Sequence, residues 1–144
     1  MIDFCVLGSG ISGSTIANLL NKKYSVIIID KAKGIGGRAS NKKINKSVSF
    51  DHGLQYFSPK DIYFKKYLKK LISKRILKYW SGNHIDFTFE KKVESKKIIG
   101  LKGNNDLNKY LLKKVKTYLN EEIINIKFKK NYWEIYSNKN KYKA

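Results

Sequence analysis

The stretch that decides the fold is residues 2–13, which read IDFCVLGSGISG. Its apolar start is typical of a β-strand, and Gly8, Gly10 and Gly13 then follow the spacing G-x-G-x-x-G. In this motif the first glycine permits a tight turn, the second lets a pyrophosphate approach the backbone, and the third lets helix and strand pack closely. The sequence therefore predicts a strand, a glycine-rich turn and a helix whose N-terminus faces phosphate.

A second strand is predicted over residues 24–30, after a helical pattern that ends near residue 23. Its run from Val26 to Ile29 is continuously apolar, which suits a parallel strand covered on both faces. Asp30 ends this strand, where an acidic side chain accepts hydrogen bonds from ribose hydroxyls and repels a 2′-phosphate, so NADP is disfavoured. The alternative is a glycine turn with no ligand, and the required order of strand, turn, helix and acid counts against it.

Residues 33–38, KGIGGR, which we call the arginine loop, extend the motif. The adjacent Gly36 and Gly37 let the backbone pass close to a second part of a long dinucleotide, and Arg38 offers a forked donor to phosphates or flavin carbonyls. The alternative is a surface loop with a chance arginine. Arg38 stands out because Arg75 is the other arginine among 31 basic residues.

The charge balance is strongly basic, with 31 Lys and Arg against 11 Asp and Glu and a formal net charge of +20. This charge alone would suggest a nucleic-acid partner. Recognition of phosphate and guanine favours arginine, however, and here nearly every cation is lysine. Compositional bias toward Lys, Asn, Ile and Tyr explains the charge, so we expect no nucleic-acid partner.

Other compositional features limit the class of protein. The apolar runs are too short for a membrane-spanning helix, and no signal peptide precedes the first strand. Cys5 is the chain's one cysteine, which excludes an internal disulfide and a multi-cysteine zinc site. We expect a cytoplasmic protein with no membrane partner and no metal site.

The remaining chain gives weaker secondary-structure signals. We expect a long loop at 31–47, a short strand at 47–50, a helix from about 61 to 71, strands within 83–99, a turn at 100–105 that ends in a helix N-cap, a helix over 107–118, and a hairpin of 122–128 and 132–136.

Four motifs in this order resemble one family. They are the glycine motif of residues 8–13, Asp30-Lys31, Gly36-Gly37-Arg38, and residues 50–57, FDHGLQYF. Together they resemble the renalase-like branch of the flavin amine-oxidase superfamily, whose members are NAD/FAD-dependent oxidoreductases. The last motif is the most specific. The resemblance implies bound FAD, a small-molecule substrate, and hydride transfer to flavin from an amine or a dihydronicotinamide-type compound.

The resemblance also implies a set of cofactor-binding residues. The pyrophosphate would be held by the glycine motif, the ribose side by the end of the second strand, the phosphates and flavin by the arginine loop, the isoalloxazine ring by residues 55 and 56, and the adenine by a backbone contact near residue 123. The set is Gly8, Gly10, Ile11, Ser12, Gly13, Asp30, Lys31, Gly37, Arg38, Gln55, Tyr56 and Ile123. No catalytic residue is assigned, and we expect His52 to be structural.

The predicted architecture is α/β, with a Rossmann-like FAD-binding βαβ unit and part of an α+β substrate domain. We place the FAD-binding unit and flavin loop at 1–57, a partial substrate or cap region at 58–105, and a helix and hairpin of the FAD domain at 106–144. Family members are much longer, so the resemblance implies a truncated, N-terminal half that a separately encoded C-terminal half would complete. A noncatalytic nucleotide-binding module is the main alternative, and a basic nucleic-acid-binding domain is the less favoured one.

Overall fold

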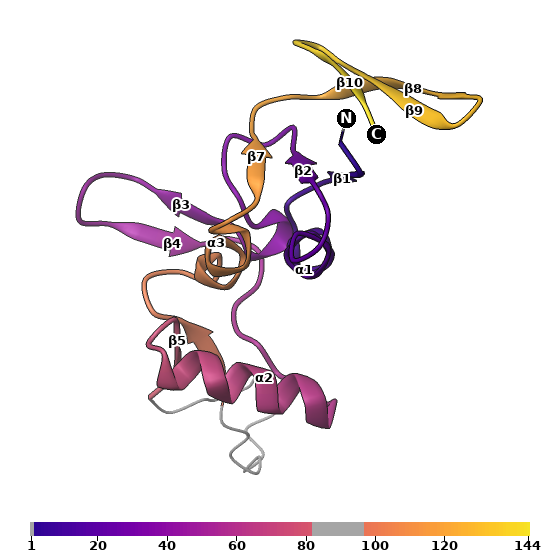
Figure 1. Cartoon of the computed structure of the whole chain (residues 1–144). Coiled ribbons are helices and arrows are strands. Elements are labelled where there is room, and N and C mark those ends of the chain that lie inside the picture. Colours follow the sequence, from indigo (N-terminus) through magenta and orange to yellow (C-terminus); the bar gives the residue numbers. More distant parts are fainter. Residues whose placement is uncertain (1, 82–96) are drawn as a thin grey trace.

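A three-stranded parallel sheet forms the centre of the computed structural model, which describes residues 2–81 and 97–144. The strands lie in the order β1-β2-β7 and are β1 (Phe4–Leu7), β2 (Val26–Ile29) and β7 (Lys116–Tyr118). The helix α1 (Ile11–Leu20) connects β1 to β2, as Figure 1 shows. All four residues of β2 are buried, as its continuous apolar run predicts. The predicted βαβ unit is confirmed.

The third strand of this sheet corrects the sequence analysis. The helix expected over 107–118 ends early, as α3 (Asp106–Leu112), and the chain then turns into β7. Leu107, Leu111 and Val115 keep helical spacing, but Thr117 and Tyr118 are residue types that favour a strand. Pairing with the free edge of β2 decides the outcome, because it satisfies backbone groups that a longer helix would leave unpaired at that edge.

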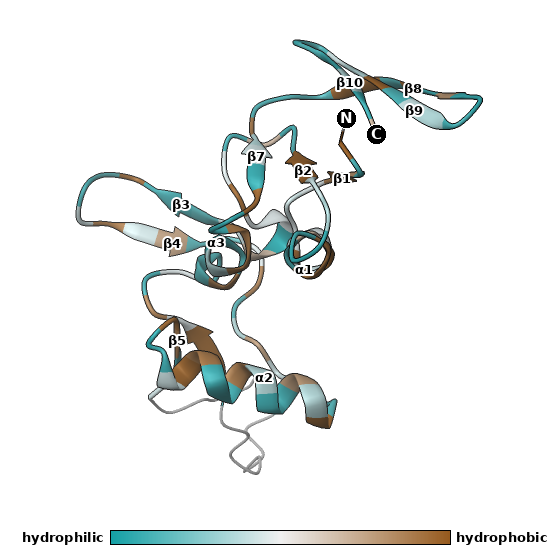
Figure 2. Ribbon diagram, in the orientation of Figure 1, coloured by the Kyte–Doolittle hydropathy of each residue, from teal (hydrophilic) through white to brown (hydrophobic). Residues whose placement is uncertain are grey.

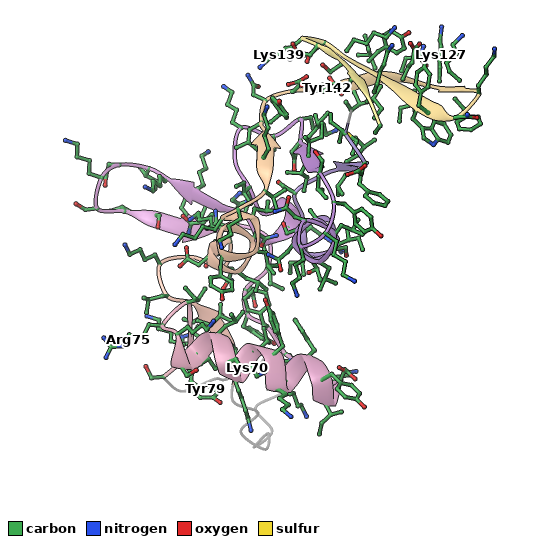
Figure 3. The ribbon with its side chains drawn as sticks, in the orientation of Figure 1. Lys70, Arg75, Tyr79, Lys127, Lys139 and Tyr142 are labelled. Atoms are coloured by element: carbon green, nitrogen blue, oxygen red, sulfur yellow. The ribbon has the colours of Figure 1, made fainter. Side chains whose placement is uncertain are left out.

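An antiparallel meander occupies one end of the molecule (Figure 1). Its strands are β8 (Ile123–Lys129), β9 (Tyr132–Ser137) and β10 (Lys141–Lys143). The predicted hairpin is confirmed as β8 and β9, whereas β10 was not predicted. The buried carboxylate of Glu121 anchors the meander by accepting hydrogen bonds from the Ser137 hydroxyl and, at 2.8 Å, from the hydroxyl of Tyr142, which Figure 3 labels on β10.

The opposite end holds α2 (Ile62–Ser73), β5 (Leu77–Tyr79) and β6 (Ile98–Gly100). The predicted helix is confirmed, and the Asp61 carboxylate caps it by accepting the Phe64 amide N–H at 2.7 Å. Figure 2 shows apolar and polar residues alternating along α2, whose apolar stripe buries Leu68 and Leu71. Most of the strands expected within 83–99 lie outside the described residues, and β6 lies at their end.

The prediction of a loop throughout 31–47 is wrong in part. It contains a short 3₁₀-helix, η1 (Gly37–Ala39), and then β3 (Asn41–Lys43). β3 pairs antiparallel with β4 (Ser49–Asp51), which is the short strand expected near 47–50, and this hairpin projects from the side of the molecule (Figure 1). β3 was not predicted, because its sequence is polar and lysine-rich and neither face of the hairpin is buried.

Two hydrophobic clusters meet at α3. One lies between the parallel sheet, α1 and α3, and the other joins α2, β5, β6 and α3. Leu107 and Leu111 enter the second cluster, whereas Leu112 enters the first. The short helix α3 therefore fixes the two halves of the described structure against each other. The division at residues 57 and 105 stays a prediction.

Within the described residues, no helix has both the length and the apolar character that crossing a membrane requires.

Candidate functional site

A groove of about 700 Å³ lies beyond the carboxyl end of β1, at the N-terminus of α1. In open α/β sheets this edge is where ligands bind. The lining comes from the glycine-rich turn, the arginine loop and the segment after β4: Leu7, Gly8, Gly10, Ile11, Ser12, Gly13, Gly36, Arg38, Ala39, Gly53 and Leu54. Six of the residues predicted from the sequence thus border one space.

The glycine-rich turn has the geometry that the motif requires. Gly8 adopts a positive φ of 94°, which side chains disfavour. At Gly13, a Cβ atom would lie 2.0 Å from the Gly8 carbonyl oxygen, so helix and turn approach too closely for any side chain. A Cβ at Gly10 would meet no atom within 4 Å. The backbone at Gly10 therefore faces the open groove, where a phosphate can approach it.

The N-terminus of α1 supplies positive electrostatic potential to this space. Gly10 is its N-cap residue and no side chain caps the helix. The first backbone N–H groups of a helix have no partner within the helix, and together with the helix dipole they attract anions. The Ser12 side chain lies beside them on the exposed side of the first turn. This arrangement suits a pyrophosphate.

Asp30 connects the end of β2 to the glycine-rich turn. Its Oδ2 accepts hydrogen bonds from the backbone N–H of Ser9 at 2.6 Å and from the Ser9 hydroxyl, and its Oδ1 accepts from the Ala32 N–H at 2.8 Å. Partial burial alone would raise the pKa of Asp30, but these hydrogen bonds and the charge of Lys31 hold the pKa below its usual value. The carboxylate is therefore ionised at neutral pH.

Ser9 is a site residue that the sequence analysis missed. It occupies a variable position of the motif, and its side chain is fully buried. The available signal was a small hydroxyl residue in the turn with an acid at the end of the next strand, because that pair can hydrogen-bond across the sheet edge. Ser9 holds Asp30 beside the groove.

The arginine loop packs directly on the glycine-rich turn. A Cβ at Gly37 would lie 3.1 Å from the Gly10 Cα, so the two loops are in van der Waals contact. The backbone N–H of Leu54 donates to the Arg38 carbonyl at 2.6 Å, which joins the arginine loop to the segment after β4. Arg38 is exposed and lines the groove, where its guanidinium is free to meet an anion.

The other six predicted residues lie outside the groove lining. Two of them, Asp30 and Gly37, contact the glycine-rich turn as described above. Lys31 is exposed next to Asp30, and Ile123 is the first residue of β8. Gln55 is exposed, while Tyr56 is partly buried with its ring 6.1 Å from that of Trp80 and 4.5 Å below the Lys97 ammonium. The roles predicted for these four residues therefore rest on the resemblance alone.

The surroundings of His52 and Cys5 fit a structural role for each residue. His52 Nε2 lies 3.2 Å from the Ser40 hydroxyl, which agrees with the structural role expected for it. Burial, and secondarily the charge of Glu121, raises the pKa of the Cys5 thiol to about 11. Across residues 2–81 and 97–144, no three His, Cys, Asp or Glu side chains are grouped so that they could hold a metal ion.

These residues fit a dinucleotide. A carboxylate offers about four acceptor positions, and Asp30 uses three of them within the chain, so one remains for a ribose hydroxyl. The uncapped helix, the open backbone at Gly10 and the cationic Arg38 match a pyrophosphate in charge and in hydrogen-bonding sense.

The comparison with known families agrees with this geometry. Residues 6–71 match the NAD(P)-binding Rossmann-like domain. The fold is Rossmann-like. The matched range covers the end of β1, then α1, β2 and the arginine loop, which are the elements that build the groove.

Several solved enzyme structures share this fold. A putrescine oxidase double mutant, redesigned in its cofactor binding, superposes with a TM-score of 0.71 at 13% identity, over 99% of this chain and 56% of its own. A tetracycline destructase gives 0.55 at 16% identity, over 96% and 35%. A cyclohexanone monooxygenase from Rhodococcus sp. Phi1, bound to NADP+, gives 0.54 at 16% identity, over 99% and 24%. At these identities the likeness shows the fold alone.

The chain spans about half the length of the putrescine oxidase that it matches.

Proposed function

We propose that this chain is the cofactor-binding part of an FAD-dependent oxidoreductase of the renalase or amine-oxidase type, acting in the cytoplasm. The observation that supports the proposal is the groove, since the glycine-rich turn and Arg38 border one space at the end of a parallel strand. The likeness to a putrescine oxidase is a second support, because that enzyme matches nearly the whole chain.

The residues of the groove have separate binding roles. The backbone N–H groups of Gly10, Ile11 and Ser12 would hold the pyrophosphate at the positive end of α1. Asp30 would accept a hydrogen bond from a ribose hydroxyl, and its negative charge would repel a 2′-phosphate. Arg38 would neutralise phosphate charge at the opposite wall.

When bound, FAD would accept a hydride from the substrate, which we propose is an amine or a dihydronicotinamide-type compound. The chain's part is to bind and orient. Gln55 and Tyr56 would border the isoalloxazine ring, as the family resemblance implies, and the Leu54 N–H joins their segment to the arginine loop. Small displacements of that segment would then change the distance of hydride transfer.

We also propose that a second polypeptide half completes the protein at the open edge of β1. The N–H groups of Phe4 and Gly8 donate toward β2, so in a parallel ladder the backbone of Cys5 and Leu7 points to the opposite edge. Among the described residues no strand pairs there. Phe4, Leu7 and the α1 residue Leu19 are 39%, 45% and 53% exposed, which suits an apolar partner.

A titration of the purified chain with FAD tests the cofactor proposal. Binding should shift and structure the visible flavin spectrum and quench flavin fluorescence, and Arg38→Ala should weaken it. Arg75→Ala is the matched control, because Arg75 lies at the far end of the molecule, away from the groove (Figure 3). Absence of saturable binding to the wild-type chain would overturn autonomous FAD binding.

The completing half has its own test. Any open reading frame downstream in the DNA is co-expressed with this chain, and co-purification with flavin and restored reduction by substrate would support a split protein. Co-purification should fail for Leu19→Asp, which places a charge on the exposed apolar surface outside the groove lining, and persist for Ile62→Asp on α2. Equal recovery with both variants would contradict docking at β1.

A noncatalytic nucleotide-binding module is the second candidate. The groove favours it independently, because every lining residue lies in the nucleotide-binding half of the fold. Such a module would bind ADP and FAD alike and show no flavin reduction with any amine or dihydronicotinamide substrate, even with the second half present.

A further inference from the structure

Three buried asparagines at the start of α3 each donate a hydrogen bond to the backbone of a different loop around the groove. They are Asn104, Asn105 and Asn108, with exposed fractions of 0%, 7% and 0%. We call them the asparagine clamp. Asparagine is mostly exposed in proteins, because a buried side-chain amide needs hydrogen-bond partners. The hydrogen bonds of these three residues therefore explain why they are buried.

Asn108 holds the glycine-rich turn. Its Nδ2 donates to the Ser9 carbonyl oxygen and to the Ser14 hydroxyl oxygen, each at 3.0 Å, and the Ser14 hydroxyl donates to the same Ser9 carbonyl at 2.9 Å. Ser9 also carries the two donors that fix Asp30. A change at Asn108 therefore acts on the pyrophosphate turn and on the ribose acceptor together.

Asn104 holds the segment after β4. Its Nδ2 donates to the Leu54 carbonyl at 2.6 Å and to the Gln55 carbonyl at 3.1 Å, while its Oδ1 accepts the Gly100 N–H at 2.9 Å. Its own backbone N–H donates to Asp51 Oδ1 at 2.9 Å. Both the Nδ2 and the Oδ1 of Asn104 are thus hydrogen-bonded. The two hydrogen bonds from Nδ2 hold the segment that we assign to the flavin ring.

Asn105 holds the arginine loop, and its role differs from the one predicted from the sequence. The turn at 100–105 was expected to end in an N-cap, and Asn105 does occupy that position, but its side chain makes no capping hydrogen bond. Its Nδ2 donates instead to the Ile35 carbonyl at 3.3 Å. Its Cβ also lies against Gly36, where an added Cβ would approach it to 3.0 Å.

The donor side of each amide sets its orientation. Within the described residues, the Oδ1 atoms of Asn105 and Asn108 accept no hydrogen bond. Rotating either amide by half a turn would place an oxygen against a carbonyl oxygen, which is repulsive. The interactions with the loops therefore outweigh the cost of an unsatisfied buried acceptor, about 1–3 kcal/mol.

We propose that the asparagine clamp positions the three cofactor-binding loops before the cofactor arrives, so that Asn108 sets affinity for the ADP part and Asn104 sets affinity for the flavin part. This inference rests on the proposed function. The three loops carry little regular structure of their own, and loops held in their bound arrangement lose less conformational entropy when a ligand binds. Because all three side chains extend from the first turn of α3 and the two residues before it, the clamp also keeps the loops in register with one another.

The test compares ligand affinities of serine variants of the full chain, measured by calorimetry with ADP and with FAD. Asn108→Ser should weaken both ligands by about tenfold, the equivalent of about one lost hydrogen bond. Asn104→Ser should weaken FAD by a similar factor and leave ADP within about twofold, since the Leu54–Gln55 segment lies on the flavin side. Equal effects of both variants on both ligands, or no effect, would overturn the assignment.

Asn18→Ser is the matched control. Its Nδ2 donates to the Leu111 carbonyl at 2.6 Å, an amide-to-backbone bond between α1 and α3 that touches none of the three loops. It should lower thermal stability as the clamp variants do and leave ligand affinity unchanged. A loss of affinity in Asn18→Ser equal to that in the clamp variants would mean that the clamp is merely structural.

Amide hydrogen exchange without ligand separates this inference from the proposed function. Asn104→Ser should speed exchange at 53–56 more than at 8–13, and Asn108→Ser should do the reverse. If the wild-type chain binds neither ligand, the proposed function fails while this exchange pattern still tests the clamp. Uniform exchange changes in both variants would overturn the clamp, whatever the chain binds. Asn→Gln variants at the same positions replace any serine variant that does not fold.

Discussion

Replacing Gly13 by alanine isolates the close contact on which the glycine-rich turn depends. The new Cβ would lie 2.0 Å from the Gly8 carbonyl oxygen and 3.2 Å from its carbonyl carbon. Real Cβ atoms essentially never approach below 3.0 Å, so the turn must move by about 1 Å away from α1. Because Gly8 also donates to the Ile29 carbonyl at 2.8 Å, this movement disturbs the end of β1 as well.

Two opposing effects set the size of the change. Alanine is favoured over glycine inside a helix by about 0.5–1 kcal/mol, whereas inserting a methyl group into a packed site costs about 1–3 kcal/mol. The overlap is with backbone, which cannot swing aside as a flexible side chain would, so the cost falls in the upper part of that range. We therefore expect a net loss of about 1–2 kcal/mol in the free energy of unfolding and a fall in ADP affinity of more than about tenfold.

Far-UV circular dichroism melts and ADP calorimetry measure both quantities. For a chain of this size, the loss corresponds to a fall in Tm of about 3–8 °C. Gly34→Ala is the control, because a Cβ there meets no atom within 4 Å. A Gly13→Ala protein that is more stable than wild type and binds ADP normally would refute the close contact, since helix propensity alone predicts that sign.

Three further predictions concern the core, the charges and the thiol. Ile28→Ala should cost about 2–5 kcal/mol in urea unfolding, whereas Ile124→Ala, on a residue that is 67% exposed, should change stability by less than about 0.5 kcal/mol; equal effects would contradict the buried parallel sheet. The Lys141 ammonium lowers the pKa of Glu134 from 4.5 to about 2, so its stabilising contribution is complete above pH 4.5 and is lost as the pH falls toward 2; the urea midpoint of Glu134→Gln should depend less on pH in that range, and an unchanged dependence would count against the ion pair. Because the pKa of Cys5 is about 11 rather than 9.0, native thiol modification at pH 8 should be about 100-fold slower than in urea, and equal rates would show an exposed thiol.

The sequence predicted the βαβ unit because its signals are local. The glycine spacing, the apolar run of β2 and Asp30 each describe a neighbouring piece of backbone, and the structure brings them to one edge of the sheet. The helix α2 and the β8–β9 hairpin were found for the same reason, since periodicity and turn residues act over a few positions.

The parts that were missed depend on distant partners. β7 forms because the edge of β2 is free, and the helical spacing of Leu107, Leu111 and Val115 gives no sign of that edge. Asn108 reads as an ordinary polar helix residue, yet it is buried against Ser9, far earlier in the chain. Such roles can be assigned only from the folded structure, because the identity of one polar residue does not indicate which distant residue it contacts.

The sequence prediction and the structure agree least on the flavin side of the site. Gln55 and Tyr56 were placed at the ring through the resemblance, and in the structure they lie outside the groove lining, tied to it through Leu54 and Asn104. The second polypeptide half that we propose at the β1 edge would supply further walls to this region.

The most direct test of a dinucleotide site at the glycine-rich turn is calorimetric titration of the full chain with ADP, the part of the cofactor that needs only the groove described above. We expect saturable binding of one ADP per chain, weaker binding of the 2′-phosphorylated analogue because of Asp30, and weaker ADP binding in Asp30→Ala. No saturable ADP binding, or equal affinity for both nucleotides in the wild-type and Asp30→Ala chains, would contradict this expectation.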